Sequence, residues 1–392
     1  MARRGTSAVV VVLLALLGGC ASAPSGDLTP PRTWAAPAAA GTDPLADYVD
    51  ARLDAMTLEQ KIASLLMVHV PGTEPAPIRS SLAATGAAGV IFMGDNVASH
   101  GQLAATAAAL DTDPGFPVLT AIDQEGGVVR RLPDTGPGAG ALRGLDPALA
   151  VGVFRERAAL VASAGVRINF GIVADVTGDR GSFIHSRVLG TDAAAAAPRV
   201  AAAVAGERDL VMSTLKHFPG HGAVAGDSHS SVPTTTMSLD EWRTTQAPPF
   251  HAGIEAGAEF VMLGHVRYSA VDDVPASLSP AWIAILRDEL GFDGIVVTDD
   301  MSMLERSGEG AYADQAGNAV AAIAAGATLL LYVGPVDVPT VVGAIAESVR
   351  GGRIPVSTID DAASRLLELR RGLSDRVGPY IHCSELCREL LG

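Results

Sequence analysis

The chain has 392 residues, of which 48% are hydrophobic, 4% aromatic and 18% charged, and 43 of them are glycine. This composition excludes a disordered or fibrous protein and predicts a large core of small side chains, while the length fits one large barrel or two ordinary domains. A formal net charge of −15 argues against nucleic acid and anionic lipid as partners.

The first twenty residues, MARRGTSAVVVVLLALLGGC, are typical of an export signal. Two arginines precede an apolar run over Ala8–Leu17, which is too short for a membrane span of about 20 residues. The ending LGGC resembles the lipobox of bacterial lipoproteins. We therefore expect residues 1–19 to be a signal peptide and Cys20 to carry a lipid that anchors the protein to the outer face of the cell membrane. The alternative is an ordinary cleaved signal or an N-terminal anchor helix.

The two ends of the chain have different compositions from its centre. Residues 20–44 are rich in Ala, Pro, Gly, Ser and Thr and have no apolar period, which predicts a flexible tether. Residues 376–392 form a tail whose role the sequence does not indicate. This tail holds Cys383 and Cys387, whose spacing on one continuous helix is poor for a disulfide. A single folded part is expected over residues 45–375.

Eight short apolar runs with β-branched residues alternate with longer helical segments in this folded part. Such runs are typical of strands that are buried on both faces of a parallel sheet. The runs lie at residues 62–70, 86–94, 117–123, 166–176, 210–218, 258–266, 294–300 and 327–334. The clearest helix candidates are Gly101–Leu110, Ala193–Glu207, Ser279–Leu290, Asp314–Ala325 and Pro339–Arg350. This alternation predicts an α/β fold, a single (β/α)₈ TIM-type barrel. A doubly wound open sheet is less favoured, because no G-x-G-x-x-G follows the first run.

Polar residues follow five of the eight predicted strands, in the stretches AIDQEGG, ADV, KHFPGHG, GHVRY and TDDMSM. Active sites of such barrels lie at the carboxyl ends of the strands. The sequence therefore predicts one active site, built from these five strand ends.

The stretch Lys216–His229, KHFPGHGAVAGDSH, holds three histidines and an aspartate and first raises the question of a metal site. A helical H-x-x-x-H motif would need its two imidazoles on one face, but Pro219 and Gly220 lie between the first two histidines and break a helix there. We therefore expect neither a metal nor another cofactor.

Two shorter patterns favour acid/base and nucleophilic chemistry. In GDSH, the Asp227 carboxylate is close enough in sequence to hydrogen-bond His229 and to raise its basicity, although the same pattern also fits a surface pair in a turn. Asp299 and Asp300 end the seventh run, where one carboxylate can cap the next helix and the other can act as a nucleophile. A nucleophile and a proton donor at one barrel mouth are what retaining glycoside hydrolysis requires.

Taken together, KHFPGHG, the following DSH, the upstream IDQEGG and the downstream TDDMSM resemble glycoside hydrolase family 3, in its β-N-acetylglucosaminidase branch. The resemblance extends over about Leu58–Leu369. It implies a barrel without a second αβα sandwich domain, which shorter members of the family also lack.

The resemblance also implies roles for individual positions. It implies that Asp299 is the nucleophile of a covalent glycosyl-enzyme intermediate, that His229 is the general acid/base, and that Asp227 orients His229. The positions that it implies for sugar binding are Asp123, Arg131, Arg187, Lys216 and His217.

These observations predict an exported, membrane-tethered β-N-acetylglucosaminidase that removes terminal β-linked GlcNAc from peptidoglycan-derived fragments or similar glycans, and that acts as a monomer. Three alternatives stay open. A β-glucosidase of the family would normally take its acid/base from another domain, and a glycoside phosphorylase would use phosphate in place of water. A lipid-anchored glycan-binding protein would need neither Asp299 nor His229. The sequence assigns no role to His221.

Overall fold

The computed structural model describes residues 43–113, 115–374 and 380. The predicted signal peptide, the lipid anchor at Cys20 and the tail with Cys383 and Cys387 lie outside the described residues, as does nearly all of the tether. The first helix already begins at Pro44, where the carboxylate of Asp43 accepts a hydrogen bond from the Leu45 N–H at 2.9 Å. None of the described helices combines the length and the apolar character that a membrane crossing requires.

Eight parallel strands surround the centre of the molecule, in the order β10-β1-β2-β3-β4-β5-β7-β9. Their bounds are Leu66–Val68 (β1), Gly89–Phe92 (β2), Leu119–Ile122 (β3), Ile168–Val173 (β4), Met212–Phe218 (β5), Phe260–Leu263 (β7), Ile295–Thr298 (β9) and Leu330–Tyr332 (β10). Each strand lies inside one of the eight predicted apolar runs. The prediction of a (β/α)₈ barrel is therefore confirmed, and the open sheet is excluded.

The barrel closes through its first and last strands. Leu66 of β1 pairs with Leu330 of β10 in parallel register. Between β9 and β10 the contact is short, with a single bridge from Val297 to Leu329 and a hydrogen bond of 3.0 Å from the Thr298 N–H to the Leu329 carbonyl. The ring of strands is consequently almost continuous.

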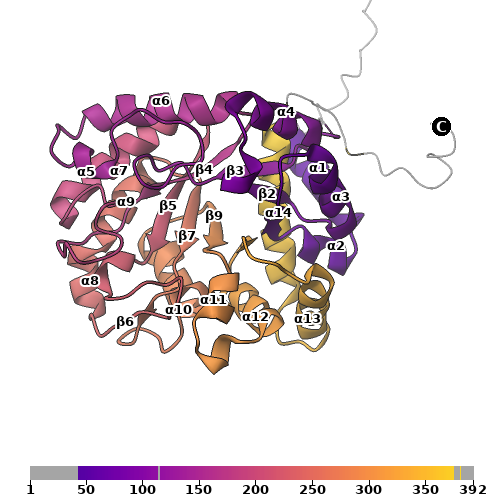
Figure 1. The fold of residues 1–392 in the computed structure, drawn as a ribbon. Coiled ribbons are helices and arrows are strands. Elements are labelled where there is room, and N and C mark those ends of the chain that lie inside the picture. Colours follow the sequence, from indigo (N-terminus) through magenta and orange to yellow (C-terminus); the bar gives the residue numbers. More distant parts are fainter. Residues whose placement is uncertain (1–42, 114, 375–379, 381–392) are drawn as a thin grey trace, which may run out of the picture. The chain divides into compact units, whose positions relative to one another are not determined.

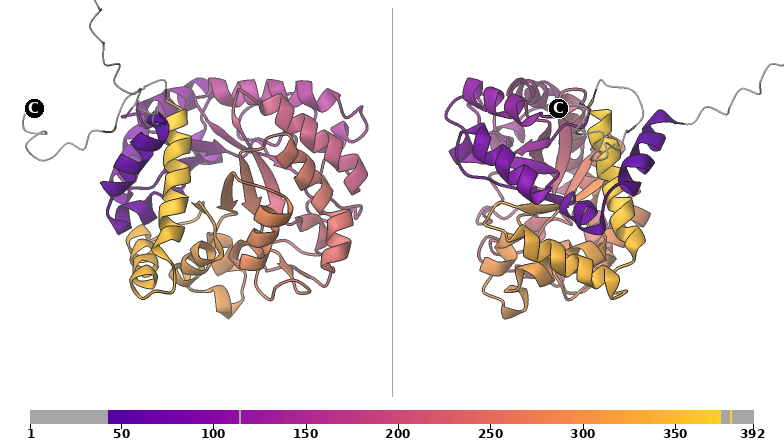
Figure 2. Two further views of the ribbon diagram at one scale, coloured as in Figure 1. Left: turned by 180° about the vertical axis from the view of Figure 1, so that it is seen from behind. Right: turned by 90° about the vertical axis from the view of Figure 1, so that its right-hand side faces the viewer.

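Helices cover the outside of the strand ring (Figure 1). Their bounds are Pro44–Asp54 (α1), Leu58–Ala63 (α2), Pro75–Thr85 (α3), His100–Leu110 (α4), Ala139–Leu142 (α5), Leu149–Ser163 (α6), Ala193–Glu207 (α7), Leu239–Thr245 (α8), Ala247–Glu255 (α9), Pro280–Ala284 (α10), Ser302–Arg306 (α11), Gln315–Ala325 (α12), Val338–Arg350 (α13) and Val356–Gly372 (α14). The first and last helices, α1 and α14, lie side by side (Figure 2). Of the five predicted helices, the one over Ser279–Leu290 is divided, because α10 continues into a π-helical segment over Ile285–Glu289.

Local sequence signals account for several helix ends. Thr57 and Gln60 form a capping box at the start of α2, in which each side chain accepts a hydrogen bond from the other residue's N–H. Asp192 caps α7 through the Ala195 N–H at 2.8 Å. Gly326 ends α12 with a left-handed φ of 109°, a conformation in which a side chain would be strained.

An aromatic cluster fixes the second half of the barrel behind the loop that follows β5. The Phe218 ring makes edge-to-face contacts with Trp242, Phe250 and Trp282, at centroid distances of 5.9, 5.3 and 5.8 Å. The Trp242 indole N–H also donates a 2.7 Å hydrogen bond to the carbonyl of Pro219. The packing energy of these large buried rings therefore holds the start of the loop in one place.

A second, two-stranded sheet fixes the far end of the same loop. Strand β6, Thr234–Thr235, pairs in parallel with β8, Arg267–Tyr268, which follows β7. The sequence pattern did not predict this sheet, because each of its strands has only two residues. Together with the aromatic cluster, it leaves the stretch from Pro219 to Pro233 attached to the barrel at both ends.

Candidate active site

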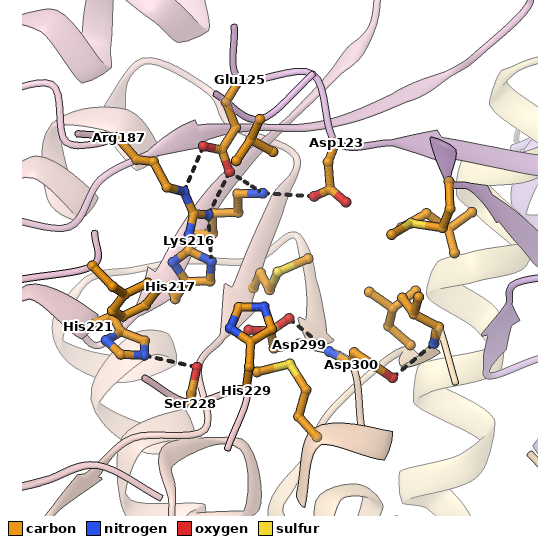
Figure 3. Close-up of a pocket in the computed structure, with 18 of the residues that line it drawn as sticks. Asp123, Glu125, Arg187, Lys216, His217, His221, Ser228, His229, Asp299 and Asp300 are labelled. Carbon is orange, nitrogen blue, oxygen red and sulfur yellow. Dashed lines mark hydrogen bonds and ion pairs between the residues drawn. The ribbon is translucent and has the colours of Figure 1, made fainter. Parts of the chain in front are cut away.

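A pocket of about 300 Å³ lies at the carboxyl ends of the barrel strands, as predicted. Its lining combines a wall of charged side chains from four strand ends (Figure 3) with apolar side chains. The apolar side chains are those of Ile91, Met93, Met262, Met303, Leu331 and Val333. The pocket therefore offers both charged and apolar contacts to a ligand.

Asp299 lies directly after β9 and lines the pocket. Its backbone N–H donates to the Leu263 carbonyl of β7 at 2.9 Å, and its carboxylate accepts the N–H of Asp300 at 2.8 Å. Burial acts to raise the pKa of Asp299, but His217, His265, the Asp300 N–H and Lys216 together lower it to about 2. The carboxylate is thus ionised at neutral pH and can act as a nucleophile.

Asp300 has a structural role. Its carboxylate accepts hydrogen bonds from the N–H of Ser302 at 3.1 Å, at the start of α11, and from the N–H of Val333 at 2.9 Å, after β10. It also pairs with Arg306 at 3.1 Å. The Asp300 carboxylate therefore caps the next helix and ties β9 to β10, while the Asp299 carboxylate makes neither of these contacts.

A network of ion pairs forms the polar wall. Lys216, at the end of β5, lies 2.8 Å from both Asp123 and Glu125, and its side chain is only 3% exposed. Arg187 binds Glu125 through two hydrogen bonds of 2.9 and 2.7 Å, and Arg131 lies 3.2 Å from Asp123. Burial acts to raise the pKa of Glu125, but the two cations lower it to about 2. Because the pKa of Lys216 and that of Arg187 are raised in turn, these two cations and Glu125 keep their charges at neutral pH.

His217 is oriented by a carboxylate from the neighbouring strand. Its Nδ1 lies 2.7 Å from Asp175, which follows β4, and its backbone N–H donates to the same carboxylate. Burial acts to raise the pKa of Asp175, but the interactions with His217 and His221 lower it. An N–H on Nδ1 that faces this carboxylate leaves Nε2, which is 3.4 Å from Arg187, at the polar wall of the pocket.

Asp227 and His229 form the hydrogen-bonded pair that the sequence suggested. Nδ1 of His229 lies 2.6 Å from Asp227, and the His229 N–H donates to the same oxygen at 3.0 Å. Both side chains are well exposed, 63% for His229 and 45% for Asp227. Since His229 lines the pocket that contains Asp299, an acid/base group and a carboxylate share one cavity.

Two further buried histidines border the site. His265, after β7, lies behind Asp299 with Nε2 2.9 Å from the Asp300 carbonyl and Nδ1 2.7 Å from the Ser277 hydroxyl. Burial lowers the pKa of His265, so its ring is neutral and holds the chain next to Asp299. His221 lines the pocket and contacts Ser228.

The structure thus brings the predicted site residues together from distant parts of the chain. Seven of them line the pocket, namely Asp123, Arg131, Arg187, Lys216, His217, His229 and Asp299, while Asp227 supports His229 from outside the lining. Among the residues that the structure describes, no group of three or more His, Cys, Asp or Glu side chains has the arrangement of a metal site.

Sequence reasoning missed Glu125 and Asp175. Both follow predicted strands, in IDQEGG and ADV, so their positions pointed to the pocket. No pattern in the sequence shows that Glu125 neutralises Lys216 and Arg187, or that Asp175 orients His217, because those partners lie between 42 and 91 residues away.

Comparison with known proteins extends this description. The family model described as "Glycosyl hydrolase family 3 N terminal domain" matches residues 57–369. A curated beta-hexosaminidase of Stenotrophomonas maltophilia (strain K279a) is 39% identical over 252 residues, which cover 61% of this chain and 75% of the relative. The beta-hexosaminidase of Xylella fastidiosa (strain 9a5c) is 38% identical over 272 residues, covering 66% of this chain and 80% of the relative.

Solved structures give the same result at the level of the fold. A glycoside hydrolase family 3 beta-N-acetylglucosaminidase from Paenibacillus sp. str. FPU-7 superposes with a TM-score of 0.75 and 31% identity, covering 86% of this chain and 68% of that one. A beta-N-acetylhexosaminidase from Beutenbergia cavernae DSM 12333 superposes with a TM-score of 0.70 and 30% identity, covering 81% and 99%.

Proposed function

This chain belongs to glycosyl hydrolase family 3 and is a glycoside hydrolase, and from that premise we propose that it is a retaining β-N-acetylglucosaminidase. The similarity to beta-hexosaminidases supports terminal β-linked GlcNAc as the sugar that it releases. One observation carries the proposed mechanism. A buried, ionised carboxylate, Asp299, shares a pocket with a hydrogen-bonded Asp–His pair on an exposed loop.

The ion-pair network would bind the sugar. Asp123 and Glu125 supply acceptors for sugar hydroxyls, and Arg131, Arg187 and Lys216 supply donors. Because these groups already neutralise one another, they are held in place before the sugar enters, which lowers the entropy cost of binding. The three methionines of the lining suit the methyl group of an N-acetyl substituent.

In the first step, Asp299 would attack the anomeric carbon while the bond to the leaving oxygen breaks. His229 would donate its proton to that oxygen, and the Asp227 carboxylate would stabilise the imidazolium before transfer. The positive charge that develops on the sugar ring lies next to an ionised carboxylate, which lowers the barrier. The product of this step is a covalent glycosyl ester of Asp299.

In the second step, His229, now neutral, would take a proton from water as the water oxygen attacks the anomeric carbon and the ester bond breaks. The sugar leaves with its original anomeric configuration, since two inversions have occurred. The exposure of His229 supports this step, because water reaches the imidazole directly from solvent.

The test is an assay of the purified full-length chain on aryl β-N-acetylglucosaminide and on aryl β-glucoside. We expect turnover of the first, with retained configuration by NMR, and at least a thousandfold loss in Asp299→Asn. A 5-fluoro GlcNAc derivative should add one sugar mass to the peptide that contains Asp299. Hydrolysis of the glucoside alone, or loss of activity with a chelator, would contradict the proposal, and release of a sugar phosphate in phosphate buffer would favour a phosphorylase.

We also propose that the natural substrates are peptidoglycan-derived fragments and that the protein is a lipoprotein at the outer face of the membrane. The sequence around Cys20 supports the anchor. Replacing Cys20 with Ser should move the protein from the membrane fraction to the soluble fraction. An unchanged distribution would contradict the anchor without affecting the enzymatic proposal.

A further inference from the structure

His221 is a buried histidine in the pocket wall that the proposed mechanism does not use. His221 is only 1% exposed. Nε2 lies 2.9 Å from the hydroxyl of Ser228, while Nδ1 is buried without a hydrogen-bond partner among the described residues. Ser228 stands between Asp227 and His229 in the chain, so His221 contacts the loop that carries the two proposed acid/base residues.

The frame that holds His221 is rigid. Its backbone N–H donates a 2.6 Å hydrogen bond to the buried Asp175, which also orients His217. Its ring packs edge-to-face against Phe183, with 4.6 Å between centroids, and against His217 at 6.0 Å. The imidazole is thus fixed to the ends of β4 and β5.

The segment that Ser228 belongs to has, by contrast, few hydrogen bonds to the rest of the barrel. Ser228 is 2% exposed, whereas the side chains on either side of it are among the more exposed of the site. In the described part of the chain, the other hydrogen bonds of residues 225–231 stay within the segment, such as that from the Ser231 hydroxyl to the Asp227 carbonyl at 2.9 Å. The bond between His221 and Ser228 is the hydrogen bond that connects this segment to the barrel.

The charge state of His221 suits a permanent hydrogen bond. Burial lowers the pKa of His221 to about 4. The nearby His217 lowers this pKa further, whereas the carboxylates of Asp175 and Asp299 act to raise it. The carboxylate of Asp227 also interacts electrostatically with His221. The ring is therefore neutral at pH 7 and has one donor and one acceptor nitrogen. A proton on Nε2 donates to Ser228 and leaves the unpartnered Nδ1 as a lone pair, which avoids a buried N–H without an acceptor.

We propose that His221 is a positioning residue that, through Ser228, holds the loop with Asp227 and His229 over the pocket, so that the proton donor stands at the glycosidic oxygen. This inference rests on the proposed glycosidase function and deepens it. It makes a specific statement about rates, because a displaced proton donor slows only those substrates whose leaving group needs the proton.

The first test compares two aryl β-N-acetylglucosaminides in the full-length chain. Phenol is a poor leaving group and needs protonation, whereas 2,4-dinitrophenolate leaves without it. We expect Ser228→Ala to lower kcat/KM about tenfold or more on the phenyl substrate and to keep it within about twofold on the dinitrophenyl substrate. His221→Phe should give the same pattern, and His221→Gln, which keeps a donor at similar reach, should recover part of the loss.

A matched control lies two residues from Ser228. Ser230 is exposed, and its hydroxyl makes no hydrogen bond within the described residues. Ser230→Ala therefore makes the same chemical change in the same loop and should leave both rates unchanged. The double variant His221→Phe/Ser228→Ala should be no slower than the slower single variant, because each change removes the same hydrogen bond.

A second readout does not depend on activity. Hydrogen exchange of residues 224–232 should become faster in Ser228→Ala and not in Ser230→Ala, while exchange in β5 stays the same. Equal losses on both substrates, or an unchanged rate ratio with unchanged exchange, would overturn the positioning role. If the wild-type chain hydrolyses neither substrate, the proposed function itself fails, so the two failures are distinguishable.

Discussion

Glu125 is a charged residue of the polar wall that pairs with two cations, Lys216 and Arg187. Its carboxylate is buried, so removing its charge leaves two buried cations with one carboxylate fewer. Removing one partner of a buried ion pair lowers protein stability far more than removing one partner of an exposed ion pair.

We therefore expect Glu125→Gln to lower the free energy of unfolding by about 3 kcal/mol at pH 7. The pKa of Glu125 is depressed to about 2 from an ordinary value of 4.5. Its contribution is therefore complete above pH 4.5 and disappears as the pH falls toward 2. Urea unfolding should show a difference between wild type and variant that shrinks from pH 7 to pH 2.5. The exposed Glu156→Gln should show no difference at either pH, and an unchanged gap at low pH would contradict the ion-pair explanation.

Glu207, at the end of α7, has a pKa that is shifted in the opposite direction from that of Glu125. It is fully buried and accepts a 2.6 Å hydrogen bond from Asn169, and burial raises its pKa to about 8. The folded protein keeps this carboxyl protonated at pH values at which the unfolded chain has already lost the proton. Folding therefore becomes less favourable as the pH rises from 4.5 to about 8.

For Glu207→Gln, we expect a gain in stability relative to wild type of about 4 kcal/mol between pH 5 and pH 8. The new amide side chain keeps an acceptor for Asn169 but has no proton to lose. Thermal unfolding at the two pH values measures the change, with Glu156→Gln again as the control. A constant difference between the two proteins across this range would show that Glu207 is ionised in the folded state.

Among the elements, the turn after β5 depends on one close backbone approach. Gly222 lies against the segment that follows β4, and a Cβ at this position would clash with the carbonyl oxygen of Val176. This contact brings the loop down onto the strand ends and so places His221 beside Asp175.

Gly222→Ala should therefore lower stability by about 1 to 3 kcal/mol through the clash and should reduce kcat/KM on the phenyl substrate by more than on the dinitrophenyl substrate. The comparison is Gly343→Ala in α13, where a new Cβ meets open space. That variant should be slightly more stable, by about 0.5 to 1 kcal/mol, with unchanged kinetics. If Gly222→Ala behaved like Gly343→Ala, the turn would have room that the structure does not show.

The strands were predictable from the sequence because each is buried on both faces and must therefore be a short apolar run, as in residues 294–300 around β9. The small sheet of β6 and β8 was not, because two-residue strands leave no period. The division of the helix over Ser279–Leu290 was not predictable either, because no Gly or Pro follows Pro280 in this segment to indicate a change of helix type. The carboxyl ends of β3, β5 and β9 located the pocket. Which carboxylate pairs with which cation depends on contacts across the barrel, and no local pattern contains that information.

In the whole molecule, the start and the end of the folded chain meet around one aromatic ring. Phe116 lies between two guanidinium groups, Arg52 of α1 and Arg370 of α14, at 3.7 and 3.6 Å from its centroid. Tyr48 and Leu367 complete the buried cluster. The ring thus joins both ends of the folded chain to the segment between α4 and β3.

We expect Phe116→Ala to lower the free energy of unfolding by about 3 to 5 kcal/mol. Phe116→Leu keeps most of the apolar volume but removes the aromatic ring. Its loss of stability should therefore be smaller, about 1 to 2 kcal/mol, and should come mainly from the lost cation–π interactions. Urea unfolding with both variants measures the two terms. Because the cluster lies away from the pocket lining, kcat/KM should stay at the wild-type value, and a matching loss of activity would contradict a purely structural role.

The pairing of β1 with β10 also has a consequence for the time course of synthesis. Leu66 and its partner Leu330 are separated by almost the whole barrel sequence. At a translation rate of about 5–20 residues per second, β1 waits roughly 10 to 50 s for the strand that covers its edge. During that interval an apolar strand edge is open to other chains. Nascent molecules of this protein are therefore open to aggregation through Leu66–Val68 until the last strand emerges.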